Sequence, residues 1–193
     1  ALLLGIGGAS NYNLEMGAGR EKKASGIAGT ALSSLAISGA VLCVIVVLFL
    51  KPLLTLFGAT KDVMPYAVDY TGITALGLPF YILSVGGNHV VRADRSPTYS
   101  MACVTAGAVI NTILDPLFIF GFEWGIKGAA WATVIGQVVS GILVVVYFWK
   151  FRKMYLEKSM LKPRLHYLKV ITALGLASCI NQIAMALVQI VLN

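Results

Sequence analysis

Residues 25–50 read SGIAGTALSSLAISGAVLCVIVVLFL and contain no Asp, Glu, Lys or Arg. A helix of about 20 mostly apolar residues can cross the ~30 Å hydrocarbon core of a bilayer, so this stretch predicts a transmembrane helix. Similar stretches recur between short polar interruptions, and we expect six segments at about 1–18, 25–50, 64–91, 99–122, 126–150 and 165–193. Because backbone polar groups in lipid must be satisfied internally, the sequence predicts an all-α, polytopic bundle of transmembrane helices.

The composition excludes most soluble classes of protein. Of the 193 residues, 58% are hydrophobic and 12% are charged, whereas about 25% of an ordinary soluble domain is charged. The net charge of +7 does not indicate a nucleic-acid partner, because the basic residues lie between apolar runs rather than on one face. The three cysteines lie inside apolar segments without metal-ligand spacing, and no HExxH, GxSxG or P-loop motif occurs. We therefore expect no enzyme activity, no cofactor and no resident metal.

The beginning of the chain also looks incomplete. The first residue is Ala1 rather than Met, and residues 1–9 are apolar with no basic region before them. We therefore expect the chain to start inside a helix, as a fragment with a truncated first segment, rather than behind a signal peptide.

The basic residues are distributed unequally between the connections. The first, third and fifth connections with their flanks hold 12 of the 15 basic residues: Arg20, Lys22, Lys23, Arg92, Arg95, Lys150, Arg152, Lys153, Lys158, Lys162, Arg164 and Lys169. Only Lys51, Lys61 and Lys127 lie on the other side. Since an excess of Lys and Arg marks cytoplasmic loops, the first, third and fifth connections are predicted to be cytoplasmic. The basic loop at about 150–164 is interpreted as a connector between two helical groups, an anionic-lipid contact or a solvated linker.

One acidic residue lies deep in an apolar segment. Most of the others, from Glu15 to Asp94, fall near segment ends, where water or headgroups can solvate them. Asp115 lies near the middle of the fourth segment, where an ionised Asp costs roughly 2.5–3.5 kcal/mol on insertion scales. Asn111 is four residues earlier and shares its helix face, so its amide can bond the carboxyl group. This pair predicts an ion-coupling site, unless Asp115 stays protonated and only locks helices together.

Pro116 follows Asp115 directly and changes the backbone next to it. Because proline has no N–H, it should leave the carbonyl of Thr112 unpaired within the helix. That oxygen would then be available to a hard cation or to water beside the carboxylate.

The fifth segment adds two polar side chains. Thr133 and Gln137 are again four residues apart on one face, so they could face Asp115, although Thr133 could equally bond its own backbone. Small residues at the start of this segment permit close helix packing. Gln137 and Asn88, which closes the third segment, are further candidates for the wall of a substrate cavity.

The pattern around Asp115 also resembles a known family. Asn111-xxx-Asp115-Pro116-Leu-Phe-Ile-Phe-Gly121, followed by Gly125-Ile-Lys-Gly-Ala-Ala-Trp-Ala-Thr133, is similar to the multidrug and toxic compound extrusion (MATE) family, especially its bacterial branch. Supporting matches are Gly17-Ala-Gly19-Arg20, Leu56-Phe57-Gly58-Ala59, and Arg92-Ala-Asp94 with Ser96-Pro97. Arg95 departs from the family pattern, which usually has Gly at this position.

The resemblance implies half of a twelve-helix transporter built from two lobes. Residues 1–150 would be helices two to six of the N-terminal lobe, residues 151–164 the cytoplasmic linker between lobes, and residues 165–193 the first helix of the C-terminal lobe. The transporter would export cationic, amphipathic small molecules across the cell membrane in exchange for H⁺ or Na⁺, and would be a monomer when complete. The cation site would contain Asn111, Asp115 and Thr133, together with an Asp on a first helix that precedes this chain.

Two alternative functions remain at this point. A lipid-linked oligosaccharide flippase of the same superfamily would be expected to line its cavity with more Arg and Lys than the segments contain. An intramembrane enzyme acting on lipids would need paired acid and base groups or metal ligands within the membrane, and the sequence offers one well-placed carboxylate.

Overall fold

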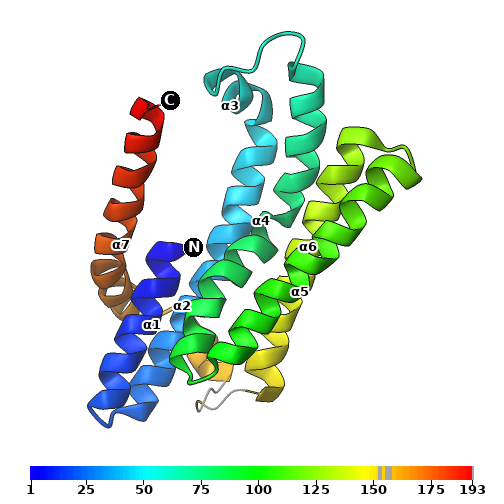
Figure 1. Ribbon diagram of the computed structural model, residues 1–193. Helices are drawn as coiled ribbons and strands as arrows, with labels where there is room; N and C mark the ends of the chain where they lie inside the picture. Colours follow the sequence, from blue (N-terminus) through cyan, green and yellow to red (C-terminus); the bar gives the residue numbers. More distant parts are fainter. Residues whose placement is uncertain (152–153, 155–157, 193) are drawn as a thin grey trace. The chain divides into compact units, whose positions relative to one another are not determined.

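The computed structural model describes residues 1–151, 154 and 158–192. These residues form α-helices with short 3₁₀ and π segments, and no strand occurs among them (Figure 1). The α-helices are α1 (Leu2–Gly17), α2 (Glu21–Leu48), α3 (Leu50–Leu56), α4 (Met64–Ala93), α5 (Pro97–Pro116), α6 (Gly125–Val146) and α7 (Leu165–Leu192). The π segments are η1 (Leu117–Gly121) and η2 (Tyr147–Phe151), and η3 (Lys158–Leu161) is a 3₁₀ helix.

The helices confirm the predicted membrane architecture. Five of the described helical stretches are long and apolar enough to cross a membrane: Glu21–Leu48, Met64–Ala93, Pro97–Gly121, Gly125–Lys150 and Leu165–Gln189. Large apolar side chains remain exposed along them, including Leu48 at 72% and Phe120 at 77%. In water such surface would be a liability, so these faces are suited to lipid.

The second expected segment differs from the structure at its end. The predicted helix over residues 25–50 is split, because α2 stops at Leu48 and the short helix α3 follows directly. Pro52 lies in the first turn of α3, where a proline without an N–H is tolerated. A separate α3 was not predicted, because its residues continue the apolar pattern of α2.

Contacts divide the chain into two compact units. Unit 1 comprises Ala1–Leu35, Val85–Ser100 and Tyr147–Asn193, and unit 2 comprises Ala36–Ser84 and Met101–Val146. Lys51, Lys61 and Lys127, the three basic residues predicted to be on the outer side, all belong to unit 2. Part of the predicted linker over 151–164, including Arg152 and Lys153, lies outside the described residues, and the predicted division into lobes stays a prediction.

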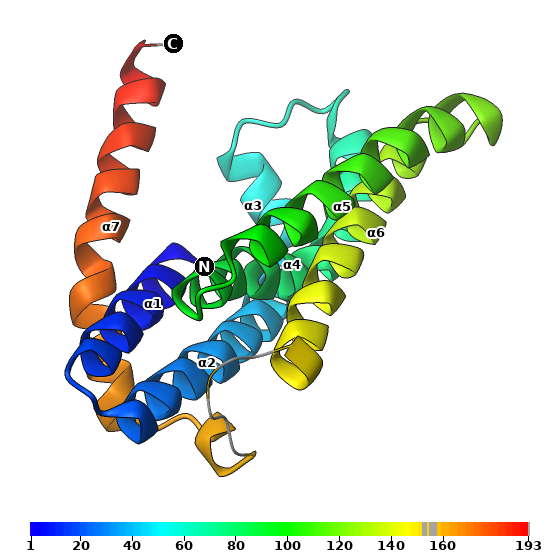
Figure 2. The same cartoon turned by 60° about the horizontal axis from the view of Figure 1, so that its bottom comes forward.

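In unit 1, α1 and α7 lie side by side, as both views show (Figures 1 and 2). Gly7 and Gly175 permit this approach, because a Cβ on either would collide with a backbone carbonyl of the other helix. The buried amide of Asn11 donates to the carbonyl of Val170 on α7 at 3.1 Å and to that of Gly7 at 2.8 Å. Backbone contact and a polar bond therefore both join α1 to α7.

In unit 2, a chain of hydroxyl groups joins three helices. Ser84 on α4 donates to the Oγ of Ser140 on α6 at 2.9 Å, and Ser140 donates to the carbonyl of Cys103 on α5 at 2.8 Å. Both serines are buried. Hydrogen bonds between helices contribute about 0.6 kcal/mol on average in a membrane protein, so the chain modestly stabilises α4, α5 and α6 around the site described next.

Candidate functional site

Two glycines bring α5 and α6 together beside the predicted ion site. A Cβ on Gly136 would lie 2.8 Å from the carbonyl oxygen of Gly107 and 3.1 Å from the Cβ of Asn111. The first distance leaves no room for a side chain at position 136 and the second is tight, so glycine at this position permits the helix spacing. The close approach places the start of the Asn111 side chain against α6.

Asn111 and Asp115 pair as their spacing predicts. The Nδ2 of Asn111 donates to the Oδ1 of Asp115 at 3.5 Å, and both residues are half-buried. This distance is at the long limit for a hydrogen bond. The carboxylate therefore keeps most of its acceptor capacity for another group, such as a proton or a cation.

The backbone after Asp115 widens into a π turn. α5 ends at Pro116, η1 follows without a break, and the N–H of Phe122 donates to the carbonyl of Leu117 at 3.0 Å. Single π turns are rare and occur frequently at functional sites, and this one directly follows Asp115 and Pro116. The predicted availability of the Thr112 carbonyl stays a prediction.

Thr133 makes a hydrogen bond within its own helix, which was the alternative to the hypothesis that it faces Asp115. Its hydroxyl donates to the carbonyl of Ala129 at 2.9 Å. Among the described residues, no hydrogen bond joins Thr133 to Asn111 or Asp115. The hydroxyl oxygen still has lone pairs that can accept a bond or ligate a cation, so the assignment of Thr133 to the ion site stays a prediction.

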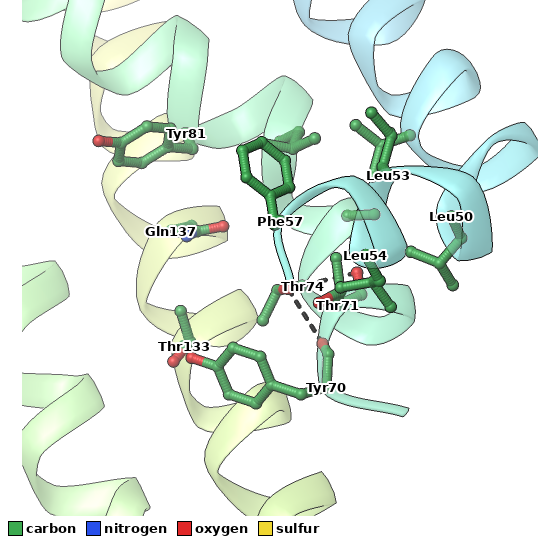
Figure 3. Close-up of a pocket in the computed structure, with 13 residues that line it drawn as sticks. Leu50, Leu53, Leu54, Phe57, Tyr70, Thr71, Thr74, Tyr81, Thr133 and Gln137 are labelled. Carbon is green, nitrogen blue, oxygen red and sulfur yellow. Dashed lines mark hydrogen bonds between the residues drawn. The ribbon is translucent and has the colours of Figure 1, made fainter. Parts of the chain in front are cut away.

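A cavity of about 420 Å³ opens beside Thr133 within unit 2 (Figure 3). Residues from α2, α3, α4 and α6 line it: Val46, Leu50, Leu53, Leu54, Phe57, Tyr70, Thr71, Thr74, Ala75, Leu78, Tyr81, Thr133 and Gln137. Asn111 and Asp115 are not part of this lining. Two of the predicted residues, Thr133 and Gln137, thus share a mainly apolar cavity with the aromatic rings of Tyr70 and Tyr81.

Gln137 presents an unused acceptor in this cavity. Its Oε1 is buried and, within the described part of the chain, accepts no hydrogen bond. A Cβ on Gly77 of α4 would collide with the same oxygen, so glycine at 77 makes the space for the amide. A buried carbonyl without a donor costs free energy, so the side chain is suited to a ligand that brings an N–H or O–H donor.

Asn88 lies in unit 1, where it is 2% exposed. Its backbone carbonyl accepts from the hydroxyl of Ser100 at 3.4 Å. Its assignment to a substrate cavity stays a prediction.

Asp94 contradicts the expectation that it is solvated at the end of a segment. It is 2% exposed and accepts bonds from the hydroxyls of Tyr12 at 3.2 Å and Tyr147 at 2.8 Å. The Tyr147 hydroxyl also lies 2.8 Å from the Oγ of Ser96. This cluster joins α1, η2 and the turn between α4 and α5, and sequence patterns could not predict it, because its members are far apart along the chain.

Arg95 occupies a backbone conformation that favours glycine. Its φ is 58°, in the left-handed region, which costs a residue with a Cβ roughly 1–2 kcal/mol. The departure from the family pattern noted at this position therefore places a strained residue in the tight turn between α4 and α5.

Comparison with known proteins supports the resemblance. The MatE family model matches residues 1–117. The chain belongs to this family. It is similar to the multidrug export protein MepA of Staphylococcus haemolyticus (strain JCSC1435), with 27% identity over 192 residues that cover 99% of this chain and 42% of the relative. MepA of Staphylococcus aureus (strain MSSA476) is also 27% identical, and 43% of its length is covered. The chain thus spans about two fifths of the length of these curated relatives.

Solved structures of the family have the same fold. A MATE in the bent conformation matches with a TM-score of 0.90 and 25% identity, covering 100% of this chain and 43% of the other. An inward-facing MATE family transporter of the MOP superfamily matches with a TM-score of 0.87 and 25% identity, covering 96% of this chain and 43% of the other. The predicted family and fold class are therefore confirmed. Family members are transporters rather than enzymes, and the chain is part of a multi-pass plasma membrane protein.

Proposed function

We propose that this chain forms part of an exporter of cationic, amphipathic compounds that exchanges them for H⁺ or Na⁺, with Asp115 as the exchange carboxylate. The supporting observation is the half-buried pair of Asn111 and Asp115 on a helix that carries no other charged residue. Its relatives include proteins named for multidrug export. A titratable group inside a membrane-spanning helix, here the candidate span Pro97–Gly121, is costly unless it is used, so the pair favours ion coupling over a purely structural role.

The chemistry of the pair suits a proton or a hard cation. The Asp115 carboxylate, the Asn111 amide carbonyl and the Thr133 hydroxyl all offer oxygen atoms, which are the ligands that hard cations prefer. A proton needs only the carboxylate. In the proposed exchange the ion neutralises the Asp115 carboxylate, and release of the ion restores a negative charge that attracts a cationic substrate to the cavity beside Thr133, which Asp115 does not itself line.

The cavity beside Thr133 suits the substrate. The rings of Tyr70 and Tyr81 offer aromatic faces to a cation, and the Oε1 of Gln137 offers an acceptor. No Lys or Arg is among the described residues that line it. That composition favours a cationic substrate over the anionic headgroup that a lipid-linked oligosaccharide flippase would bind.

The test uses the protein expressed from its complete gene in inside-out membrane vesicles, with ethidium as the probe. Asp115→Asn keeps the size of the side chain but removes its titratable charge, so ethidium export should fall at least tenfold while expression persists. Asp62→Asn, the same change at an exposed loop position, is the matched control and should export normally. Imposing a proton gradient or a sodium gradient separately identifies the coupling ion.

Two outcomes would contradict the proposal. If Asp115→Asn exports ethidium as well as the parent under both gradients, Asp115 has a structural role. If neither gradient drives export by the parent protein, the exchange mechanism is wrong.

A further inference from the structure

A second hollow lies in unit 2, beside lysines that the sequence predicts to be on the outer side of the membrane. Its volume is about 700 Å³, and α3, the following loop and the start of α4 form its wall. The lining residues are Lys51, Thr55, Ala59, Lys61, Met64, Pro65, Val68 and Asp69. It is separate from the cavity beside Thr133, because the two share no lining residue.

The charge of this hollow is positive. Lys51 and Lys61 both line it, and within the described part of the chain neither lies within ion-pair distance of a carboxylate. The acidic lining residue, Asp69, pairs with Lys127 at 3.2 Å, which offsets its charge. Asp62 follows Lys61 in the sequence but is not part of the lining. The two lysines are thus left to attract an anion.

The surroundings of the lysines are apolar. The rest of the wall is mainly Ala59, Met64, Pro65 and Val68. Leu56, which ends α3 next to the lining residue Thr55, is 79% exposed, and Phe57 after it is 83% exposed and also lines the cavity beside Thr133. Exposed apolar groups of this size mark a membrane or partner surface. A positive hollow beside an apolar surface is complementary to an amphiphile with an anionic head.

We propose that this hollow binds the phosphate of an anionic phospholipid of the outer leaflet, with Lys51 and Lys61 on the phosphate and the acyl chains along the exposed side chain of Leu56. The volume of the hollow lies within the range of small-molecule sites, about 300–1,000 Å³, so it accommodates a headgroup. Few basic residues are expected on the outer side of a membrane protein. Two lysines that line one hollow on the predicted outer side, neither of them in an ion pair among the described residues, therefore indicate a lipid contact rather than a signal for topology.

The test measures lipid binding to the protein expressed from its complete gene and purified in a neutral detergent. Native mass spectrometry compares bound phosphatidylglycerol with phosphatidylcholine, and a photoactivatable phosphatidylglycerol identifies the labelled peptide. The parent should prefer phosphatidylglycerol, with crosslinks within residues 48–69. The double variant Lys51→Gln/Lys61→Gln should lose roughly fivefold in affinity per lysine, since each basic residue near an anionic surface contributes about 1 kcal/mol.

Matched variants separate this site from general attraction to anionic lipid. Lys22→Gln/Lys162→Gln removes two exposed lysines of unit 1 and should leave the crosslinks at 48–69 unchanged. Lys51→Arg/Lys61→Arg should restore binding. The proposal is overturned if the outer double variant keeps its crosslinks, if the unit 1 variant loses them equally, or if millimolar inorganic phosphate displaces the lipid, which would indicate a site for free phosphate. A thermal unfolding midpoint equal to that of the parent shows that each variant is folded.

Discussion

Tyr147→Phe should destabilise the protein, because it removes one hydroxyl from the buried cluster around Asp94. Tyr147 is 1% exposed and Asp94 is 2% exposed, and 2.8 Å separates the hydroxyl from the Oδ2 of the carboxylate. Water cannot replace the lost donor at such a site. A hydrogen bond to a charged group contributes about 1.5–3 kcal/mol, and this range is the expected loss in the free energy of unfolding. Tyr12→Phe should cost less, about 1 kcal/mol, since its bond to Asp94 is longer at 3.2 Å.

The measurement is reversible unfolding of the purified protein in mixed detergent micelles, with each variant compared at the same detergent composition. Tyr66→Phe is the matched control, because Tyr66 is 59% exposed, and it should change the free energy of unfolding by less than about 0.5 kcal/mol. A double-mutant cycle with Asp94→Asn should give a coupling energy of about 1 kcal/mol or more between residues 94 and 147. A coupling near zero, or equal effects of Tyr147→Phe and Tyr66→Phe, would refute the argument.

Two further changes test the strained turn and the cavity. Arg95→Gly should raise the free energy of unfolding by about 0.5–1 kcal/mol, since glycine relieves the left-handed strain but is freer in the unfolded chain. Arg95→Ala should not raise the free energy of unfolding. If it raises that free energy as much as Arg95→Gly does, the stabilisation comes from loss of the positive charge rather than from relief of strain. Gly77→Ala should displace the Gln137 amide and weaken ethidium binding roughly three- to tenfold, the value of one hydrogen bond. Fluorescence titration with ethidium measures the change in affinity. If Gly77→Ala acts through the Gln137 amide, adding it to Gln137→Ala should weaken ethidium binding no further.

The segments and the Asn111–Asp115 pair could be predicted from the sequence, because both depend on residues that are close along the chain. An apolar run of sufficient length specifies a membrane helix whatever its neighbours are, since the lipid rather than the partner helix satisfies its side chains. A spacing of four residues places two side chains on one helix face in any helix. These local rules predicted the helical class, the five long segments together with a shorter first one, and the contact between Asn111 and Asp115.

Tertiary packing decided the features that the sequence could not predict. Asp94 was expected in water but is buried, because Tyr12 and Tyr147 come from distant segments and supply the donors that make burial tolerable. The acceptor of Gln137 lies in a cavity because Gly77, on another helix, leaves room for it. Hydrophobic patterns specify which residues leave water, whereas the partner of a buried polar group depends on which helices approach closely enough to reach it.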